Sequence, residues 1–177
     1  MKNITTALLC LLFSITVFSQ NDLCTDAIAV SCGDTVTGST DAATSTGAPT
    51  GFCGTSSGAP GVWYEFTGTG QEITFSLCGS SYDTKIQVYS GDCSNLECID
   101  GNDDSCSTQS EVSITSIENE SYLVYVYGWG SSTGDFTLDV SCAEAPDPIE
   151  NDICTDAITV SCGDTVTGST DAATSTG

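Results

Sequence analysis

The sequence predicts an all-β fold, a jelly-roll-like antiparallel β-sandwich that is stapled by disulfides and built in tandem repeats. Three observations predict it. Short runs rich in β-branched and aromatic residues recur along the chain, separated by Gly, Ser, Asn and Asp. No stretch after residue 20 carries a helical period of useful length, and ten cysteines follow residue 20. Seven or eight antiparallel strands in about 120 residues are typical of two packed sheets.

The strand predictions follow from local pattern. In Glu72–Leu77, alternate apolar residues point to one buried face, and the run Asp135–Val140 repeats this alternation. Ser121–Gly128 is apolar on both faces, so it is expected to lie centrally and to be covered on two sides. The full set of predicted strands is Thr35–Thr40, Val62–Thr67, Glu72–Leu77, Lys85–Ser90, Glu111–Ile117, Ser121–Gly128 and Asp135–Val140.

Residues 1–20 read as a secretory signal peptide. Lys2 precedes an apolar run from Ala7 to Phe18, and a polar break follows at residues 19–20. The run is shorter than the roughly 20 apolar residues that span a bilayer, which disfavours the alternative of an uncleaved anchor. Cys10 is expected to leave with this segment. The mature chain is therefore predicted to be secreted, with no membrane insertion after signal cleavage, and to be associated with the cell surface.

The remaining cysteines are predicted to form disulfides, because an exported chain meets an oxidising environment. Zinc is the disfavoured alternative, since the chain has no histidine and no CxxC pair, that is, no two cysteines separated by two residues. Short loops favour the pairs Cys24–Cys32 and Cys93–Cys98, and a loop closed by Cys154–Cys162; the other pairings stay open. The predicted disulfide residues are Cys24, Cys32, Cys53, Cys78, Cys93, Cys98, Cys106, Cys142, Cys154 and Cys162.

An internal repeat sets the domain boundaries. Residues 151–177 repeat residues 21–47 at an offset of 130 residues, with differences only at Leu23/Ile153 and Ala29/Thr159. The prediction is a β-sandwich unit at 21–142, a proline-rich acidic linker at 143–150, and the truncated start of a second repeat at 151–177. The second copy can also replace residues 21–47 in a neighbouring molecule, as in domain swapping.

The charge of the chain limits its partners. The formal net charge is −22, and Lys85 is the only cation after residue 20. Nucleic acids and anionic lipids are bound through Lys and Arg, so both are excluded as partners. The predicted partners are an extracellular glycan or protein and the neighbouring repeats of the same chain. An acidic surface also suits divalent cations.

Residues 100–104 form the best candidate site for a cation. Asp100, Asn102, Asp103 and Asp104 are expected on one irregular turn with Gly101, and Asp83 is expected on an adjacent loop. Ca²⁺ prefers six to eight oxygen ligands in a flexible cage, so these residues predict a structural Ca²⁺ site. The alternative is that Asp and Asn here form turns by accepting hydrogen bonds from the backbone.

Aromatic residues offer a second candidate site. Alternating aromatics in strands most often pack across strands, and Trp63 and Tyr125 are assigned to packing. Tyr127 and Trp129 are candidate ligand contacts, because Trp129 lies between two glycines near the end of a predicted strand.

No catalytic site is predicted. The absence of histidine removes Ser-His-Asp and Cys-His nucleophile systems as usually built. Paired carboxylates for glycoside hydrolysis remain open by composition, but no pair stands out. No glycine-rich phosphate loop with its lysine is present. The sequence therefore indicates a protein that is not an enzyme.

A family resemblance rests on four runs, VWYEFTGTG at 62–70, CGSSYDTKIQVYSGDC at 78–93, GNDDSC at 101–106 and YVYGWGSSTGDFTLDVSC at 125–142. Together they resemble the tandem extracellular β-sandwich repeats of secreted Bacteroidetes surface proteins, which are similar to bacterial pre-peptidase C-terminal domains. The resemblance implies a jelly-roll-like fold, export and a non-catalytic binding or adhesion role, with bound calcium in some relatives.

The function predicted from these features is a secreted, non-catalytic repeat module for adhesion or for a structural stalk, which binds glycan or protein. The alternative is an accessory domain of a large secreted hydrolase or peptidase whose catalytic domain lies beyond residue 177. Near-identical copies favour the first.

Overall fold

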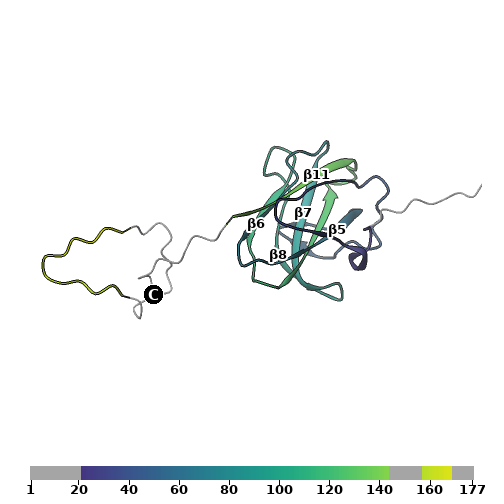
Figure 1. Cartoon of the computed structure of the whole chain (residues 1–177). Coiled ribbons are helices and arrows are strands. Elements are labelled where there is room, and N and C mark those ends of the chain that lie inside the picture. The colour runs from purple at the N-terminus through teal and green to yellow at the C-terminus, as the bar shows by residue number, and fades with distance from the viewer. Residues whose placement is uncertain (1–20, 144–156, 169–177) are drawn as a thin grey trace, which may run out of the picture.

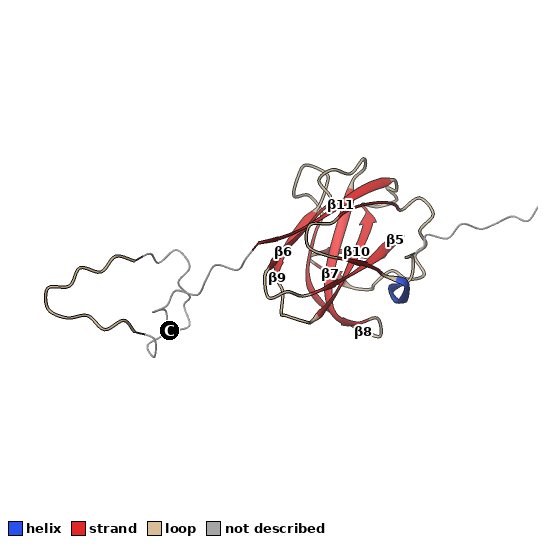
Figure 2. Ribbon diagram, in the orientation of Figure 1, coloured by secondary structure: helices blue, strands red, loops and turns tan. Residues whose placement is uncertain are grey.

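Two β-sheets packed face to face form the body of the protein (Figures 1 and 2). The structure is a computed structural model that describes residues 21–143 and 157–168. The predicted signal peptide, residues 144–150 of the predicted linker and most of the second repeat copy lie outside the described residues, as does Cys154; Ala143, the first residue of the predicted linker, is the last residue of a strand. Residues 157–168 contain no strand.

All seven predicted strands are present, and the structure adds four that the sequence pattern did not indicate. A short 3-10 helix, η1, precedes them at Cys24–Asp26. The strands are β1 Ile28–Val30, β2 Thr35–Ser39, β3 Phe52–Cys53, β4 Thr55–Ser56, β5 Gly61–Thr67, β6 Glu72–Ser76, β7 Thr84–Asp92, β8 Asn95–Asn102, β9 Glu111–Thr115, β10 Ser121–Gly128 and β11 Asp135–Ala143. The additions are β1, β3, β4 and β8. Within the described ranges, no helix is long and apolar enough to cross a membrane.

The five-stranded sheet has the order β1-β5-β10-β7-β8, and the four-stranded sheet has the order β2-β11-β6-β9. Strand pairs are antiparallel except β1 with β5, which run parallel. A separate two-stranded hairpin joins β3 to β4. Strands β1 and β2 are therefore the edge strands of the two large sheets on the amino-terminal side.

The core between the sheets follows the alternation that the sequence predicted. Ile73, Phe75 and Leu77 are fully buried from the four-stranded sheet, together with alternate residues of β11. They meet the inner residues of β5, β7 and β10, where Phe66 and Phe75 pack edge to face at 5.6 Å between ring centroids. Burial of this apolar surface, at about 25 cal/mol per Å², is the main source of stability.

The outer face of the three central strands of the five-stranded sheet, β5, β10 and β7, is also largely buried, which confirms the expected central place of β10. A row of aromatic rings crosses this face, with Trp63 4.7 Å from Tyr125 and Tyr125 stacked at 5.1 Å on Tyr127. The amino-terminal segment and the loop before β5 cover the row, and the indole Nε1 of Trp63 donates to the carbonyl of Gly47 at 2.9 Å. The assignment of Trp63 and Tyr125 to packing is confirmed.

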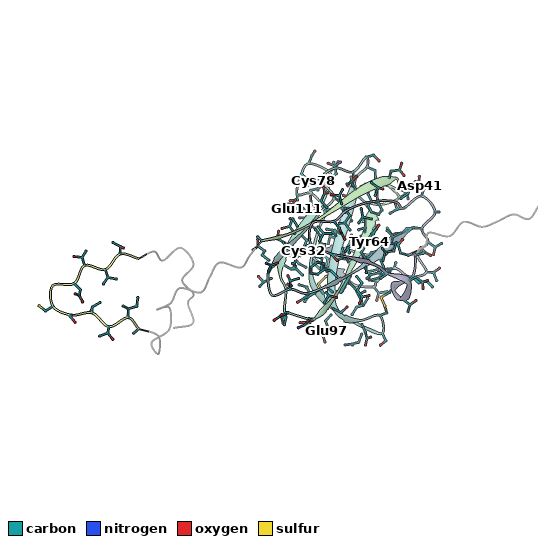
Figure 3. The ribbon with its side chains drawn as sticks, in the orientation of Figure 1. Cys32, Asp41, Tyr64, Cys78, Glu97 and Glu111 are labelled. Atoms are coloured by element: carbon teal, nitrogen blue, oxygen red, sulfur yellow. A yellow bond between two sulfur atoms is a disulfide. The ribbon has the colours of Figure 1, made fainter. Side chains whose placement is uncertain are left out.

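Four disulfides cross-link the domain: Cys24–Cys93, Cys32–Cys142, Cys53–Cys98 and Cys78–Cys106. The sequence correctly predicted that these eight cysteines form bridges. Figure 3 shows the side chains of the domain, with the acidic residues Asp41 and Glu97 on its surface.

The two local pairings expected from short loops are wrong for a geometric reason. Cys93 follows β7, whereas Cys98 pairs with Tyr89 further along the β7–β8 hairpin, about 10 Å from the turn at the rise of a strand. The extended strand β1 likewise separates Cys24 from Cys32. Disulfides need Cα atoms within about 7 Å, so each cysteine pairs across the fold instead. The expected Cys154–Cys162 loop involves a residue outside the described ranges.

Candidate functional site

Three chain segments meet at one end of the five-stranded sheet. Asp83 immediately precedes β7, Asp103 and Asp104 immediately follow β8, and Trp129 immediately follows β10. Strand β7 is antiparallel to both neighbours, with Ile86 opposite Asn102 and Thr84 opposite Gly128. The start of β7 and the ends of β8 and β10 therefore lie together.

A cluster of carboxylates occupies this end of the sheet. Oxygen atoms of Asp83, Asp103 and Asp104 all lie within 4.8 Å of one another. Asp104 is exposed and the other two residues are partly buried. The Oδ1 atoms of Asp83 and Asp103 are buried, and neither has a hydrogen-bond partner among the residues that the structure describes. Buried polar atoms normally have a partner, so these two oxygens have unused capacity to accept a hydrogen bond or to bind a cation.

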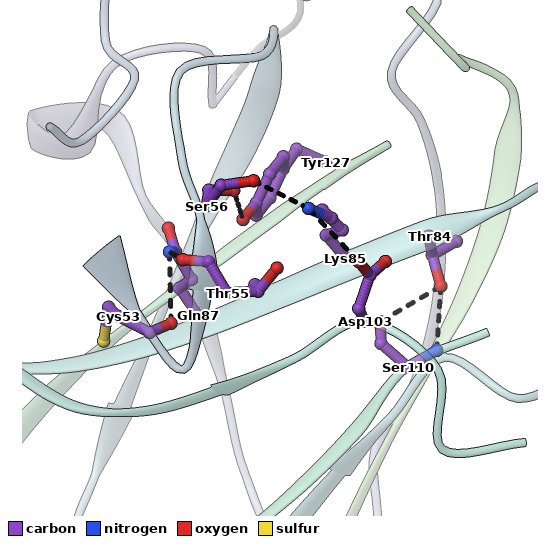
Figure 4. Close-up of polar contacts among 9 residues, drawn as sticks. All are labelled: Cys53, Thr55, Ser56, Thr84, Lys85, Gln87, Asp103, Ser110 and Tyr127. Carbon is purple, nitrogen blue, oxygen red and sulfur yellow. Dashed lines mark hydrogen bonds and ion pairs between the residues drawn. The ribbon is translucent and has the colours of Figure 1, made fainter. Parts of the chain in front are cut away.

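Lys85 is the counter-ion of the cluster and is the only Lys or Arg in the described part of the chain. Its side chain is 5 % exposed, and its Nζ lies 3.3 Å from Oδ2 of Asp103. The same Nζ donates to Oγ of Ser56, on β4, at 3.0 Å (Figure 4). A buried ammonium group requires such partners, because the loss of hydration is costly.

The surroundings of the cluster raise the pKa of Asp83 above its ordinary value of 3.8. Desolvation is the largest cause, the negative charges of Asp103 and Asp104 add to it, and Lys85 opposes it. One ammonium group thus faces three carboxylates. The cluster therefore keeps an excess of negative charge that a further cation would neutralise.

A buried hydroxyl pair fixes the start of β7. The Thr84 and Ser110 hydroxyls lie 3.1 Å apart, and the Ser110 amide donates to Oγ1 of Thr84 at 3.0 Å. The Thr84 amide donates to the carbonyl of Thr108 at 3.0 Å. Nearby, the Cys78–Cys106 disulfide ties the segment after Asp104 to the end of β6. The cluster is thus flanked by the hydrogen-bonded start of β7 on one side and by the Cys78–Cys106 disulfide on the other.

Trp129 lies directly beside the cluster. Its backbone amide donates to the carbonyl of Asp83 at 3.1 Å, and its carbonyl accepts from the Ser132 amide at 2.9 Å. Its side chain is 57 % exposed. Gly128 permits this tight turn, because a Cβ there would lie 1.9 Å from the carbonyl oxygen of Ser132. An exposed tryptophan is therefore hydrogen-bonded through its backbone to a residue of the carboxylate cluster.

The prediction of an irregular turn at 100–104 is wrong for residues 100–102. Asp100, Gly101 and Asn102 belong to strand β8, which spreads their side chains along the sheet. Oδ1 of Asp100 accepts from the Gly101 amide at 2.8 Å, and Oδ1 of Asn102 accepts from the Glu111 amide at 3.3 Å. These two residues accept backbone hydrogen bonds, as the alternative expected, but they do so within a strand and not in a turn. Asp100 is not in the carboxylate cluster.

Tyr127 is placed with the packing residues and not on the binding surface. It is 1 % exposed, and its hydroxyl donates to the carbonyl of Ser56 at 2.7 Å. Burial raises the pKa of the phenol above its ordinary value of 10.0. Its ring therefore presents no face to a ligand.

Sequence reasoning did not assign Lys85 or Ser56 to the site. The signal for Lys85 was its status as the only cation after residue 20 in a chain of net charge −22. A lone cation in such a chain is expected to have a specific carboxylate partner. Nothing in the sequence pattern indicates that the β3–β4 hairpin, which carries Ser56, folds over β7.

The chain was also compared with known proteins. No family model and no curated protein matches it. Among solved structures it is similar to the pre-peptidase C-terminal domain of a collagenase from Bacillus anthracis, at 15 % identity and a TM-score of 0.45, with 65 % of this chain and 94 % of that chain covered. It is also similar to PliG of Aeromonas hydrophila, a periplasmic inhibitor of g-type lysozyme, at 15 % identity and a TM-score of 0.43, with coverage of 66 % and 97 %.

Proposed function

We propose that residues 21–143 are a non-catalytic extracellular binding module, and that it binds its ligand at the surface formed by Trp129 with Asp83, Asp103 and Asp104. The observation that carries this proposal is that Trp129, whose side chain is exposed, lies next to the cluster in the fold: its backbone amide donates to the carbonyl of Asp83 at 3.1 Å. Exposed tryptophans tend to dominate the energy of binding interfaces, because they bury a large area and lose little side-chain entropy.

The ligand class we propose is a neutral glycan. A sugar ring presents an apolar face that stacks on an indole, and hydroxyl groups that donate to carboxylates such as Asp104. The net charge of −22 repels anionic polysaccharides. Catalysis is not proposed, since the chain has no histidine to activate a nucleophile.

We propose further that the carboxylate cluster takes a structural Ca²⁺. The two buried, unpartnered oxygens of Asp83 and Asp103 and the nearby carboxylate of Asp104 fit a hard cation, which prefers oxygen ligands. When bound, the ion would neutralise the excess negative charge. Lys85 stays paired with Asp103, and its single positive charge neutralises only part of the negative charge of the three carboxylates.

The biological role we propose is adhesion or a structural stalk at the cell surface. The disulfides are typical of a secreted or envelope location. Repetition of residues 21–47 at 151–177 supports an array of such modules, which gives avidity without strong affinity at one site. An accessory role beside a secreted hydrolase would use the same binding surface.

A glycan array probed with the full chain, once with Ca²⁺ and once with a chelator, tests this function. The proposal expects retention on a set of neutral glycans, with stronger retention in Ca²⁺. Absence of binding to every neutral glycan in both conditions would overturn it.

A further inference from the structure

The outer face of the four-stranded sheet carries polar side chains along β2 and β11. Phe136 of β11 is buried in the core, so its neighbours Asp135 and Thr137 point to the opposite, outer face. Thr37 of β2 lies directly opposite Thr137 in the register of the two strands, and Ser39 lies opposite Asp135. Two rows of hydroxyl and carboxylate groups therefore lie side by side near the start of β11.

The sheet has a hollow beside Thr137 because β6 is short. Strand β6 ends at Ser76, and the chain then turns, with the Ser80 amide donating to the carbonyl of Leu77 at 2.9 Å. Gly79, and not a strand residue, is therefore the neighbour of Thr137 on this side, and a Cβ on Gly79 would lie 3.6 Å from the Cβ of Thr137. Because glycine has no side chain, this space stays open.

The hollow has a volume of about 490 Å³. Sites for small ligands range from about 300 to 1,000 Å³, so its size fits one small molecule. The threonine methyl groups and glycine Cα atoms of its wall are apolar, whereas its hydroxyl groups and its one carboxylate are polar. The residues that supply these groups are Thr37, Gly38, Gly79, Ser81, Asp135 and Thr137.

Hydrogen bonds fix the wall of the hollow. The Ser80 hydroxyl donates to the carbonyl of Thr137 at 3.4 Å and accepts from the amide of Thr137 at 3.2 Å. The amide and the hydroxyl of Ser81 donate to the carbonyl of Asp135, at 3.2 and 2.7 Å. Because the segment is already docked on β11, little conformational entropy is lost when a ligand binds there.

Three polar side chains of the hollow have unused hydrogen-bonding capacity. Within the described part of the chain, the side chains of Thr37, Thr137 and Asp135 make no hydrogen bond or ion pair. The next row of the same face differs, since the Thr35 hydroxyl donates to the carboxylate of Asp139 at 2.6 Å. The polar groups of the hollow can therefore bind the hydroxyl groups of a ligand, both as donors and as acceptors.

The chemistry of the hollow fits a sugar better than an ion. One carboxylate does not supply the roughly six to eight oxygens that Ca²⁺ prefers, and its negative charge repels an anion. A pyranose ring has C–H groups that contact the apolar wall and hydroxyl groups that donate to the carboxylate of Asp135. Its hydroxyl oxygens also accept hydrogen bonds from Thr37 and Thr137.

We propose that this hollow, lined by Thr37, Gly79, Asp135 and Thr137, binds one neutral pyranose residue. The proposal extends the proposed function, glycan binding, to a second site that shares no residue with the surface of Trp129 and the carboxylate cluster. Each of the two sites can therefore be tested without the other.

Titration of the isotope-labelled full chain with small glycosides, followed by NMR, tests the proposal. The probes are the methyl glycosides of glucose, galactose, mannose and N-acetylglucosamine, with glucosamine as a cationic comparison. The proteins are the wild type and Trp129→Ala, which lacks the other proposed sugar contact. In both proteins, at least one neutral probe is expected to shift the backbone amides of Thr37, Gly79 and Thr137 until they saturate. The dissociation constant is expected in the millimolar range, because a monosaccharide has few atoms to contact the protein.

Two substitutions in the hollow have matched controls on the same outer face. Gly79→Leu fills the hollow and is expected to abolish the shifts, whereas the control Thr115→Leu should leave them unchanged. Asp135→Asn is expected to weaken binding about tenfold, because it replaces a charged hydrogen-bond acceptor. Its control Glu72→Gln removes the same charge and should bind as the wild type does. Glu72 and Thr115 are exposed residues opposite each other in β6 and β9, outside the hollow.

Four results would overturn the proposal. The first is the absence of saturable shifts with every neutral probe. The second is binding that Trp129→Ala abolishes, which would assign the sugar to the Trp129 surface alone. The third is binding that persists in Asp135→Asn and in Gly79→Leu; if Gly79→Leu fails to fold, Asp135→Asn decides. The fourth is binding of glucosamine alone, which would make the ligand a cation and not a neutral sugar.

Discussion

The Nζ atom of Lys85 lies 3.3 Å from Oδ2 of Asp103. The only Lys or Arg side chain of the described domain therefore forms an ion pair with one member of the cluster of three carboxylates. Lys85 is buried and Asp103 is partly exposed. The pair therefore anchors the loop after β8 to the start of β7, and leaves Asp83 and Asp104 without a cation of their own.

Substitution of Lys85 by Met is expected to lower the free energy of unfolding by about 2 kcal/mol. Removal of one partner of a buried pair costs about 3–5 kcal/mol, and the partial exposure of Asp103 reduces this cost. Urea denaturation of Lys85→Met beside the exposed control Glu118→Gln measures the difference. Equal midpoints for the two variants would contradict the role of Lys85.

The pH dependence of stability should report on Asp83. Its pKa is raised in the folded protein above 3.8, so the folded state holds the proton more tightly than the unfolded chain does. The stability from this group is present below about pH 4 and is lost as the pH rises through the folded pKa. Asp83→Asn removes that loss.

In the presence of a chelator, Asp83→Asn is thus expected to match the wild type in melting temperature near pH 3 and to exceed it at pH 7. Thermal melts at pH intervals between these values measure the difference in melting temperature between the variant and the wild type. If that difference stays constant or decreases with rising pH, the carboxylate of Asp83 is not destabilised by its surroundings.

Calcium binding has an internal optical probe. Trp63 is fully buried, whereas Trp129 is exposed and its amide is bonded to Asp83. Addition of Ca²⁺ is expected to change the emission of Trp129, to raise the melting temperature of the wild type, and to do neither in Asp83→Asn. Trp129→Phe should lose the optical change and keep the thermal shift. A wild type insensitive to Ca²⁺ in both readouts would contradict the proposed site.

Gly101 is expected to be intolerant of a side chain. It lies in β8, and a Cβ there would be 2.1 Å from the carbonyl oxygen of Cys53, next to the Cys53–Cys98 bridge. Gly101→Ala should lower the free energy of unfolding by about 1–3 kcal/mol through overpacking. Gly79→Ala is the matched control, since the nearest atom there is 3.6 Å away. Similar stability of the two variants would contradict this close approach.

The sequence predicted the parts of the fold that depend on local pattern. Alternation placed Ile73, Phe75 and Leu77 in the core, and the two apolar faces of Ser121–Gly128 placed this strand in the centre of its sheet. Strand β8 was not predicted, because the alternation of NLECIDGN is limited to its first four residues and the strand lies at an exposed sheet edge. Residues 100–102 were therefore assigned to a turn.

The rest of the site depends on contacts that are distant in sequence. Asp83 and Trp129 were separate hypotheses, and only the antiparallel register of β7 with β10 brings them together. Disulfide pairing failed for the same reason, since Cys24 and Cys93 are 69 residues apart and meet only in the folded sandwich. Local spacing contains no information on such pairings.

The most direct test of the central claim is glycan binding by Trp129→Ala beside Ile117→Ala. Ile117 is also exposed and lies before β10, whereas Trp129 lies after that strand. Loss of one exposed side chain should leave the stability of either variant within about 0.5 kcal/mol of the wild type. The account predicts at least tenfold weaker binding by Trp129→Ala and unchanged binding by Ile117→Ala to the glycans that the wild type retains. Equal binding by the two variants would contradict it.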